Sequence, residues 1–240
     1  MAKLPTQYLE LPDIKLAYTE YGSGPNLILL HGNSQSKRIF GDYQTRHFAA
    51  FHSYALDSRG HGESVSADDA YSIEQYSLDV IHFCEALGIQ EAYVIGYSDG
   101  GNIALFLAEK RPDIFTKLVA ISPNYLVSGT NDSIKLIRRL YRLFKLLRRL
   151  GFNTRKMIMR FELMLTDIGI SDDQLRGITT SLRILYAEKD MIKEDHFLAI
   201  HDLVPGSTLR KIAHSTHMSI PNKPETIQDI QHYLTSTQAV

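Results

Sequence analysis

Residues 91–110 read EAYVIGYSDGGNIALFLAEK, and this stretch decides the fold. The apolar segment 91–95 suits a buried β-strand, whereas 101–110 suits an α-helix. Ser98 lies at the junction, between two glycines at positions where side chains would collide with the strand and the helix. A serine on so sharp a turn has a strained backbone and a hydroxyl pushed clear of the sheet. The free N–H groups of the helix start point toward it, so the stretch predicts a nucleophile beside an oxyanion-stabilising site.

Strand-like and helix-like segments alternate along the rest of the chain. Strands are expected as a pair within 6–20 and at 27–30, 53–56, 118–121, 183–187 and 208–212. Helices are expected within 36–50 and at 73–87 and 223–235. This alternation predicts an α/β fold with a mostly parallel central sheet and helices on both faces. Ligands of such sheets bind beyond the carboxyl ends of the strands.

One segment, 123–180, lacks a good strand. Within it, 134–150 has leucines at helical spacing and predicts an amphipathic helix, with more helix at 154–165 and 171–177. We therefore expect residues 1–122 and 181–240 to form the core, and 123–180 to form a small helical lid over the carboxyl ends of the strands.

The overall composition is that of an ordinary globular chain, 44% hydrophobic and 22% charged, with a net charge of −1. This charge gives no bias toward nucleic acid. The single cysteine, Cys84, excludes an intrachain disulfide, and no segment resembles a signal peptide or a bilayer span. The sequence has no metal-ligand spacing and no phosphate-binding loop. We expect a cytoplasmic protein without metal or organic cofactor; its oligomeric state stays open.

A serine hydroxyl needs a base to remove its proton and an acid to orient that base. Where the nucleophilic serine lies on such a turn between a strand and a helix, the three residues occur along the chain in the order Ser, then Asp or Glu, then His. Asp190 follows the strand predicted at 183–187 and is favoured as the acid over Glu188 and Asp195. His217 precedes the last predicted helix and is favoured as the base over His214.

Five ordered motifs carry a resemblance to a known family. They are LHGN at 30–33, DSRGHGES at 57–64, the serine turn, AEKD at 187–190, and His217 upstream of PE at 224–225. In these motifs the chain resembles α/β-hydrolase-fold enzymes of the lid-bearing esterase, lipase and C–C hydrolase type. The resemblance implies Ser98 as nucleophile, Asp190 as orienting acid and His217 as base. It also implies an oxyanion hole made by the backbone N–H groups of Asn33 and Asp99.

Several other polar residues of these motifs are interpreted as structural. His31 is expected to brace its loop, and His214 to make structural hydrogen bonds. The remaining three are expected to fold a loop beneath the site: Arg59, His61 and Ser64.

The resulting functional hypothesis is a serine hydrolase that cleaves a small or medium carboxylic ester through an acyl-enzyme, with a small molecule as its substrate. Thioester, amide and C–C cleavage use the same residues and stay open. So do acyl transfer and a role as a small-molecule receptor on a hydrolase scaffold.

Charge gives two further hypotheses about binding. Asp99 either caps the following helix or, together with Asn33, contributes to substrate binding and favours a cationic group. Residues 131–160 carry a net charge of +9 and leave the rest of the chain at −10. This basic segment is interpreted as a solvated helix face, with adsorption to an anionic surface or steering of an acidic substrate as alternatives.

Overall fold

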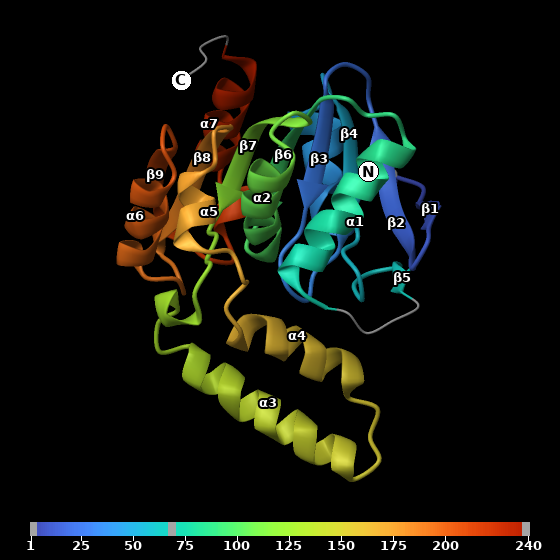
Figure 1. The fold of residues 1–240 in the computed structure, drawn as a ribbon, viewed down its shortest axis with the longest axis vertical. Helices are drawn as coiled ribbons and strands as arrows, with labels where there is room; N and C mark the ends of the chain where they lie inside the picture. The colour runs from blue at the N-terminus through green and yellow to red at the C-terminus, as the bar shows by residue number, and fades with distance from the viewer. Residues whose placement is uncertain (1–3, 67–70, 237–240) are drawn as a thin grey trace.

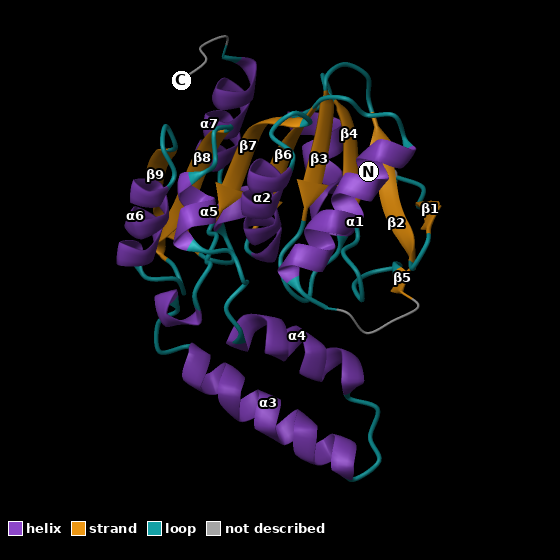
Figure 2. Ribbon diagram, in the orientation of Figure 1, coloured by secondary structure: helices purple, strands orange, loops and turns teal. Residues whose placement is uncertain are grey.

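A computed structural model describes residues 4–66 and 71–236 and contains one twisted sheet with helices on both of its faces (Figures 1 and 2). The strand order is β1-β2-β4-β3-β6-β7-β8-β9, with β5 beside β2. Six neighbouring strands are parallel to one another: β4, β3, β6, β7, β8 and β9. Strand β2 runs antiparallel to β1, β4 and β5. The predicted fold class, with a mostly parallel sheet, is confirmed.

The strands have the following bounds: β1 Gln7–Leu11, β2 Ile14–Tyr21, β3 Asn26–Leu30, β4 His52–Leu56, β5 Val65–Ser66, β6 Ala92–Tyr97, β7 Phe115–Ile121, β8 Ser181–Lys189 and β9 Thr208–Thr216. The helices are α1 Ile73–Ala86, α2 Asp99–Lys110, α3 Ile134–Arg149, α4 Arg155–Leu165, α5 Asp172–Arg176, α6 Glu194–Leu203 and α7 Pro224–Thr235. Four shorter helical turns are η1 Lys37–Phe40, η2 Tyr43–His47, η3 Val127–Gly129 and η4 Ile220–Asn222.

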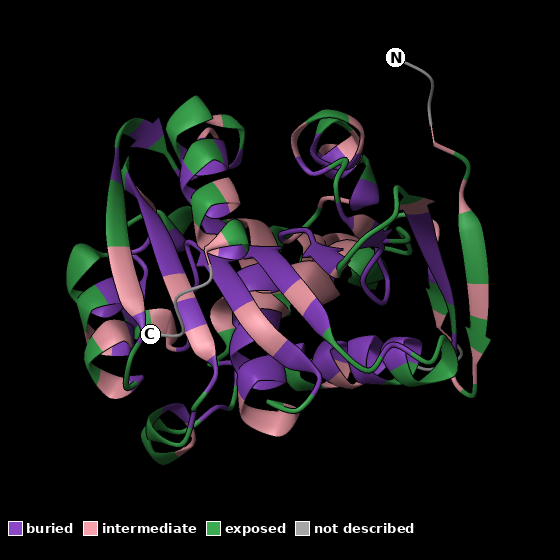
Figure 3. Cartoon of the chain, turned by 90° about the horizontal axis from the view of Figure 1, so that it is seen from above, coloured by how far each residue is buried: buried purple, intermediate pink, exposed green. Residues whose placement is uncertain are grey.

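The sheet is the middle of three layers. Its central strands are apolar on both faces, as parallel strands between two helical layers must be, and Figure 3 shows them buried between helices with exposed outer faces. One hydrophobic cluster joins the sheet to α1, α2, α5 and α6. A second cluster joins the other face to α7, η1 and η2.

The regular helix expected within 36–50 is not what forms there. The segment makes a 3₁₀ turn at η1 and a π-type turn at η2. Fully buried Gln44 accepts a hydrogen bond from Thr19 Oγ1 and donates to the backbone oxygens of Thr19 and Ser53. Contacts with strands β2 and β4, rather than a continuous helical ladder, therefore shape this segment.

Helices α3 and α4 form an antiparallel pair, the α3–α4 hairpin (Ile134–Leu165), which lies beyond the carboxyl ends of the strands (Figure 1). In this view α4 lies between the sheet and α3, and α3 is outermost. Helix α5, from the same predicted insertion, instead packs on α2 and α6, and its Leu175 is fully buried in the core. Among the described residues, no helix is long and apolar enough to cross a lipid bilayer.

A buried ion pair holds the loop that follows β3. The ammonium of Lys37 lies 2.5 Å from Asp57 Oδ2, and both side chains are at most 1% exposed. The other oxygen of Asp57 accepts the backbone N–H of Lys37 at 2.7 Å, and Oδ2 also accepts that of Glu63 at 2.8 Å. One carboxylate thus clamps the loop between β3 and η1 to the loop after β4.

Replacement of Asp57 by Ala should destabilise the protein by about 3–5 kcal/mol, because it leaves the buried ammonium of Lys37 with only the longer contact to Glu63 at 3.4 Å. Urea unfolding followed by circular dichroism measures this change. The control is Arg38→Ala, which breaks an exposed pair with Glu63 and should cost less than about 1 kcal/mol. Equal losses in the two variants would contradict the assignment of the clamp.

Candidate active site

The turn between β6 and α2 holds Ser98 in a conformation that few non-glycine residues adopt, with φ 55° and ψ −115°. Such a backbone costs about 1–3 kcal/mol and persists only where the surroundings enforce it. A Cβ on Gly96 would lie 2.0 Å from the carbonyl oxygen of Gly100, and one on Gly100 would lie 2.1 Å from that of Leu30. Both positions therefore require glycine, as the sequence predicted.

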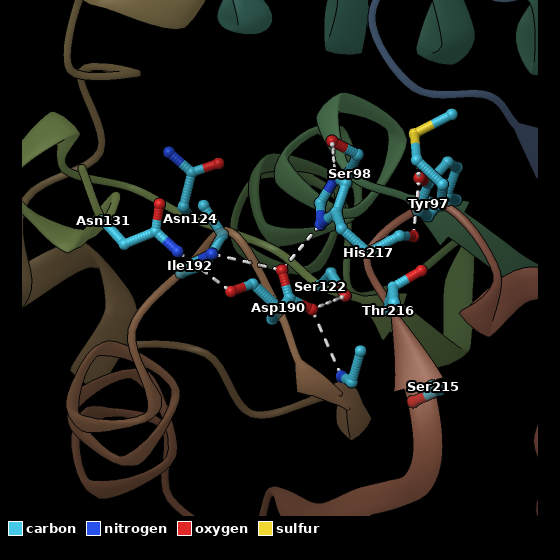
Figure 4. Close-up of polar contacts among 12 residues, drawn as sticks. Tyr97, Ser98, Ser122, Asn124, Asn131, Asp190, Ile192, Ser215, Thr216 and His217 are labelled. Atoms are coloured by element: carbon cyan, nitrogen blue, oxygen red, sulfur yellow. Dashed lines mark hydrogen bonds and ion pairs between the residues drawn. The ribbon is translucent and has the colours of Figure 1, made fainter. Parts of the chain in front are cut away.

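Ser98, His217 and Asp190 come together in one hydrogen-bonded chain (Figure 4). The Oγ of Ser98 lies 3.1 Å from His217 Nε2, and His217 Nδ1 lies 2.7 Å from Asp190 Oδ1. The three residues follow the carboxyl ends of β6, β9 and β8, respectively. A carboxylate in this place keeps the imidazole Nδ1 protonated, which leaves Nε2 free to accept the serine proton.

The carboxylate of Asp190 is held on both oxygens. Oδ2 accepts hydrogen bonds from Ser122 Oγ at 2.6 Å and from the Ala187 N–H at 3.2 Å, and Oδ1 accepts the Ile192 N–H at 3.1 Å. Burial acts to raise the pKa of Asp190, but the hydrogen bonds from His217 and Ser122 outweigh it and hold the pKa below its usual value. The acid is therefore an anion beside the imidazole.

Ser122 is a supporting residue that the sequence analysis did not single out. It is fully buried, directly follows β7, and has a positive φ of 51°. Its position in the sequence could have indicated this role, because Ser122 follows β7, the strand between the two that carry Ser98 and Asp190. A serine before Pro123, however, matches no known motif.

The rivals considered for the acid and the base lie elsewhere. The His214 side chain is 93% exposed, and its Nδ1 comes no nearer than 4.0 Å to Glu188. The structural hydrogen bond expected of His214 is made by its backbone N–H, which donates to Glu188, and the side chain takes no part. Asp195 lies in the first turn of α6, where a carboxylate interacts favourably with the free N–H groups.

His217 is fixed from its main chain as well. The hydroxyl of Tyr97 donates to the His217 carbonyl oxygen at 2.8 Å, and the two rings lie 5.4 Å apart (Figure 4). Since Tyr97 immediately precedes Ser98, the strand that carries the serine also positions the histidine.

The loop after β3 brings Asn33 to the site. A Cβ on Gly32 would lie 3.0 Å from the Cβ of Ser98, so this backbone lies directly against the serine. His31 braces the loop: its Nδ1 donates to the Gly32 carbonyl at 2.8 Å and its Nε2 accepts the Ser58 N–H at 3.1 Å. One donor and one acceptor require a neutral ring, in keeping with burial, which lowers the pKa of His31.

The loop of the DSRGHGES motif contains the other residues interpreted as structural. Arg59 is buried and pairs with Asp79 and Asp13. Ser64 Oγ donates to the Asp57 carbonyl and accepts the Ala17 N–H, and His61 Nδ1 donates to the Arg59 carbonyl.

One of the two hypotheses for Asp99, that it caps the helix that follows it, is wrong, because Asp99 is itself the first residue of α2 and Ser98 holds the N-cap position. The Asp99 carboxylate accepts a hydrogen bond from Asn33 Nδ2 at 3.0 Å and lines the cavity at Ser98. The same amide nitrogen donates to the Arg160 carbonyl of α4 at 3.0 Å. Burial raises the pKa of Asp99 to about 6, against the lowering effects of the Asn33 hydrogen bond and of His217.

The cavity at Ser98 is small, about 30 Å³, which is room for about two water molecules. The α3–α4 hairpin forms its outer wall. The lining residues are Asn33, Ser98, Asp99, Asn102, Asn124, Thr130, Ile134, Ile137, Leu163, Met164, Met191, Ile192 and His217. In the described part of the chain, no cluster of His, Cys, Asp or Glu is arranged to hold a metal ion.

Comparison with known proteins gives the family. The sequence profile of the alpha/beta hydrolase fold matches residues 25–166, more than half of the chain. The chain therefore belongs to the alpha/beta hydrolase fold family, which supports hydrolysis as its class of reaction. The matched range includes Ser98 and ends before Asp190 and His217.

Individual relatives differ in the reactions that their names state. The chain is 30% identical over 113 residues to 2-(acetamidomethylene)succinate hydrolase of Mesorhizobium japonicum, and this alignment covers 47% of the chain and 41% of the relative. The chain is 36% identical, over 126 positions, to bifunctional epoxide hydrolase 2 of Sus scrofa (51% and 22%). The alignments thus span less than half of either relative. The structure of carboxylesterase CesB from Bacillus subtilis superimposes with a TM-score of 0.78 at 18% identity, over 98% of this chain and 92% of that one.

Substitution of Ser122 by Ala should lower kcat/KM for hydrolysis by about tenfold, because it removes a charge-assisted hydrogen bond from the carboxylate that orients His217. Ser122→Gly should show the same loss, which separates the missing hydroxyl from strain at the positive φ. Steady-state ester hydrolysis is the measurement.

Ser215→Ala is the matched control, because Ser215 is equally buried but bonds to Ile212 and Glu188 instead of Asp190. It should retain full activity. Wild-type rates in both Ser122 variants would show that the serine does not support the acid.

Proposed function

We propose that this chain is a serine hydrolase that cleaves a small or medium carboxylic ester through an acyl-enzyme. The observation that carries the proposal is the continuous hydrogen-bonded chain from Asp190 through His217 to the strained Ser98. In this proposal Ser98 is the nucleophile, His217 the base and Asp190 the orienting acid.

The reaction needs two similar steps. His217 Nε2 takes the proton of Ser98 Oγ as the oxygen attacks the carbonyl carbon, and the resulting oxyanion accepts hydrogen bonds from the backbone N–H groups of Asn33 and Asp99. Collapse of this intermediate breaks the bond to the leaving alcohol, which takes the proton from His217. Water then attacks the acyl-serine by the same route and releases the acid and the free serine.

The cavity supports an ester of modest size. Apart from Ser98 and His217, its walls are amides and apolar side chains, which suit an acyl group, together with the Thr130 hydroxyl and the Asp99 carboxylate. An acyl chain needs more than about 30 Å³, so the α3–α4 hairpin would act as a lid that opens for the substrate. The carboxylesterase among the structural neighbours agrees with this substrate class. The 2-(acetamidomethylene)succinate hydrolase among the relatives is named for a substrate other than a simple carboxylic ester.

Ser98→Ala should reduce kcat on p-nitrophenyl acyl esters by at least about 10⁴-fold, because the acyl-enzyme can no longer form. Rates from acetate to octanoate give the preferred chain length. An alkyl fluorophosphonate should modify Ser98 in the wild type and leave the Ala variant unmodified, as mass spectrometry can establish.

The two readouts separate the alternatives. A labelled Ser98 without ester turnover would shift the assignment to thioester, amide or C–C cleavage. A folded protein with neither labelling nor turnover would favour a receptor on a hydrolase scaffold.

Asp99 is proposed to select for a cationic group in the substrate, with Asn33 as its partner. Asp99→Asn should lower kcat/KM for an amine-bearing ester by about tenfold more than for its neutral isostere, since only the cation loses a counter-charge. The ratio of the two rates is measured, because effects on the chemical step that both esters share then cancel.

The same ratio should depend on pH in the wild type. Since the pKa of Asp99 is about 6, the carboxylate is charged above pH 6 and neutral below it. The preference for the cationic ester should therefore fall as pH drops through 6 and stay flat in Asp99→Asn. If Asp99→Asn lowers kcat/KM equally for the cationic and the neutral ester, Asp99 does not bind the cationic group.

A further inference from the structure

The arginines of the α3–α4 hairpin differ from those of the rest of the protein. Each described arginine outside the hairpin pairs with a carboxylate: Arg38, Arg46, Arg59, Arg111, Arg176, Arg183 and Arg210. Within the described residues, no carboxylate pairs with any arginine of α3, namely Arg138, Arg139, Arg142, Arg148 and Arg149. The positive charge of residues 131–160 is therefore concentrated on a helix that does not neutralise it internally.

The far end of the hairpin also exposes large apolar side chains. Leu146, Leu150 and Phe152 lie within seven positions and are 53%, 65% and 60% exposed. Leu136 and Leu143 continue an exposed row along α3. The inner side of the helix is occupied by the core and by α4, against which Phe144 packs through a ring contact with Phe161 at 5.6 Å. The outer leucines instead remain 47–65% exposed.

Basic side chains surround this apolar end. An open cleft of about 550 Å³ between α3 and α4 is lined by Lys145, Arg148, Arg149 and Arg155, with Ile158, Met159 and Glu162. Its one carboxylate, that of Glu162, already accepts a hydrogen bond from the Tyr141 hydroxyl at 2.7 Å. The cleft thus presents several cationic groups to an anion of the size of a phosphate ester.

Position in the molecule makes this end accessible. Figure 1 shows the α3–α4 turn at the extremity farthest from the sheet, with α3 as the outermost helix. The remainder of the chain carries a net charge of −10, so a negatively charged surface is attracted by the hairpin and repelled by the core. The charge distribution therefore favours a single orientation.

We propose that the far end of the α3–α4 hairpin docks on anionic phospholipid bilayers. Leu146, Leu150 and Phe152 enter the interface, and the surrounding Lys and Arg side chains bind lipid phosphates. Exposed apolar side chains at a projecting tip suit a fluid apolar phase, and the α3 arginines, which have no carboxylate partner among the described residues, suit an anionic one. A second copy fits less well, because its hairpin carries the same charge.

The test is sedimentation of the 240-residue chain with vesicles of phosphatidylcholine alone, or of equal parts phosphatidylcholine and phosphatidylglycerol. Binding is expected only to the second kind. Arg148→Glu together with Arg149→Glu should weaken the partition coefficient by at least about tenfold. Ser in place of Leu146, Leu150 and Phe152 should also weaken it by at least about tenfold.

A matched control reverses two exposed basic residues of the core, Lys15→Glu with Arg46→Glu, which changes the net charge equally and should leave vesicle binding intact. Ser98→Ala should also bind like the wild type, so the outcome does not depend on the proposed reaction. The proposal is overturned if the wild type ignores anionic vesicles, or if the control and hairpin variants lose binding equally.

Two other occupants of the surface give distinct results. Self-association without vesicles that disappears in the triple Ser variant would assign the surface to a second copy. Binding of polyglutamate by a wild type that does not sediment with anionic vesicles would assign it to an acidic protein. Either result would contradict the proposed bilayer.

Discussion

The close approach of α2 to strands β3 and β6 is the constraint on which the rest of the structure depends. It leaves no space for a Cβ at Gly96 or Gly100, and it forces Ser98 into a backbone conformation that serine rarely adopts. The strain is stable because the turn is embedded in the centre of the sheet, where Val94 and Ile95 are fully buried. A rigid strand and a rigid helix thus hold the serine hydroxyl in one place.

Around this turn, neighbouring strands present the other polar groups at the same sheet edge. Asp190 follows β8, Ser122 follows β7, and the loop after β3 passes against Ser98. Two of these loops are held by charge or by hydrogen bonds: Asp57 clamps the loop after β3, and the bonds to both oxygens of Asp190 hold the loop after β8. Such preorganisation lets fixed dipoles, rather than reorganising solvent, stabilise charge in a reaction.

The α3–α4 hairpin has two unlike surfaces. Its inner side supplies apolar residues to the wall of a very small cavity and is tied to Asn33 through the carbonyl of Arg160. Its outer side carries exposed leucines and the arginines of α3, for which the described part of the chain offers no carboxylate partner. If the outer side docks as proposed, the element that covers Ser98 is also the one that meets the bilayer, and access to the serine becomes sensitive to the surface.

By itself the sequence determined the α/β class, the positions of the main strands along the chain and the three residues of the hydrogen-bonded chain. Those features rest on local rules: apolar runs, glycine at a strained turn, and a fixed order of serine, acid and histidine. The tertiary structure alone decided the irregular turns at 37–47, the support of Asp190 by Ser122, the pairing of Asp99 with Asn33, and the packing of α5 in the core. Each of these depends on contacts between residues tens of positions apart, for which no local periodicity exists, because the sheet brings them together only when it is complete.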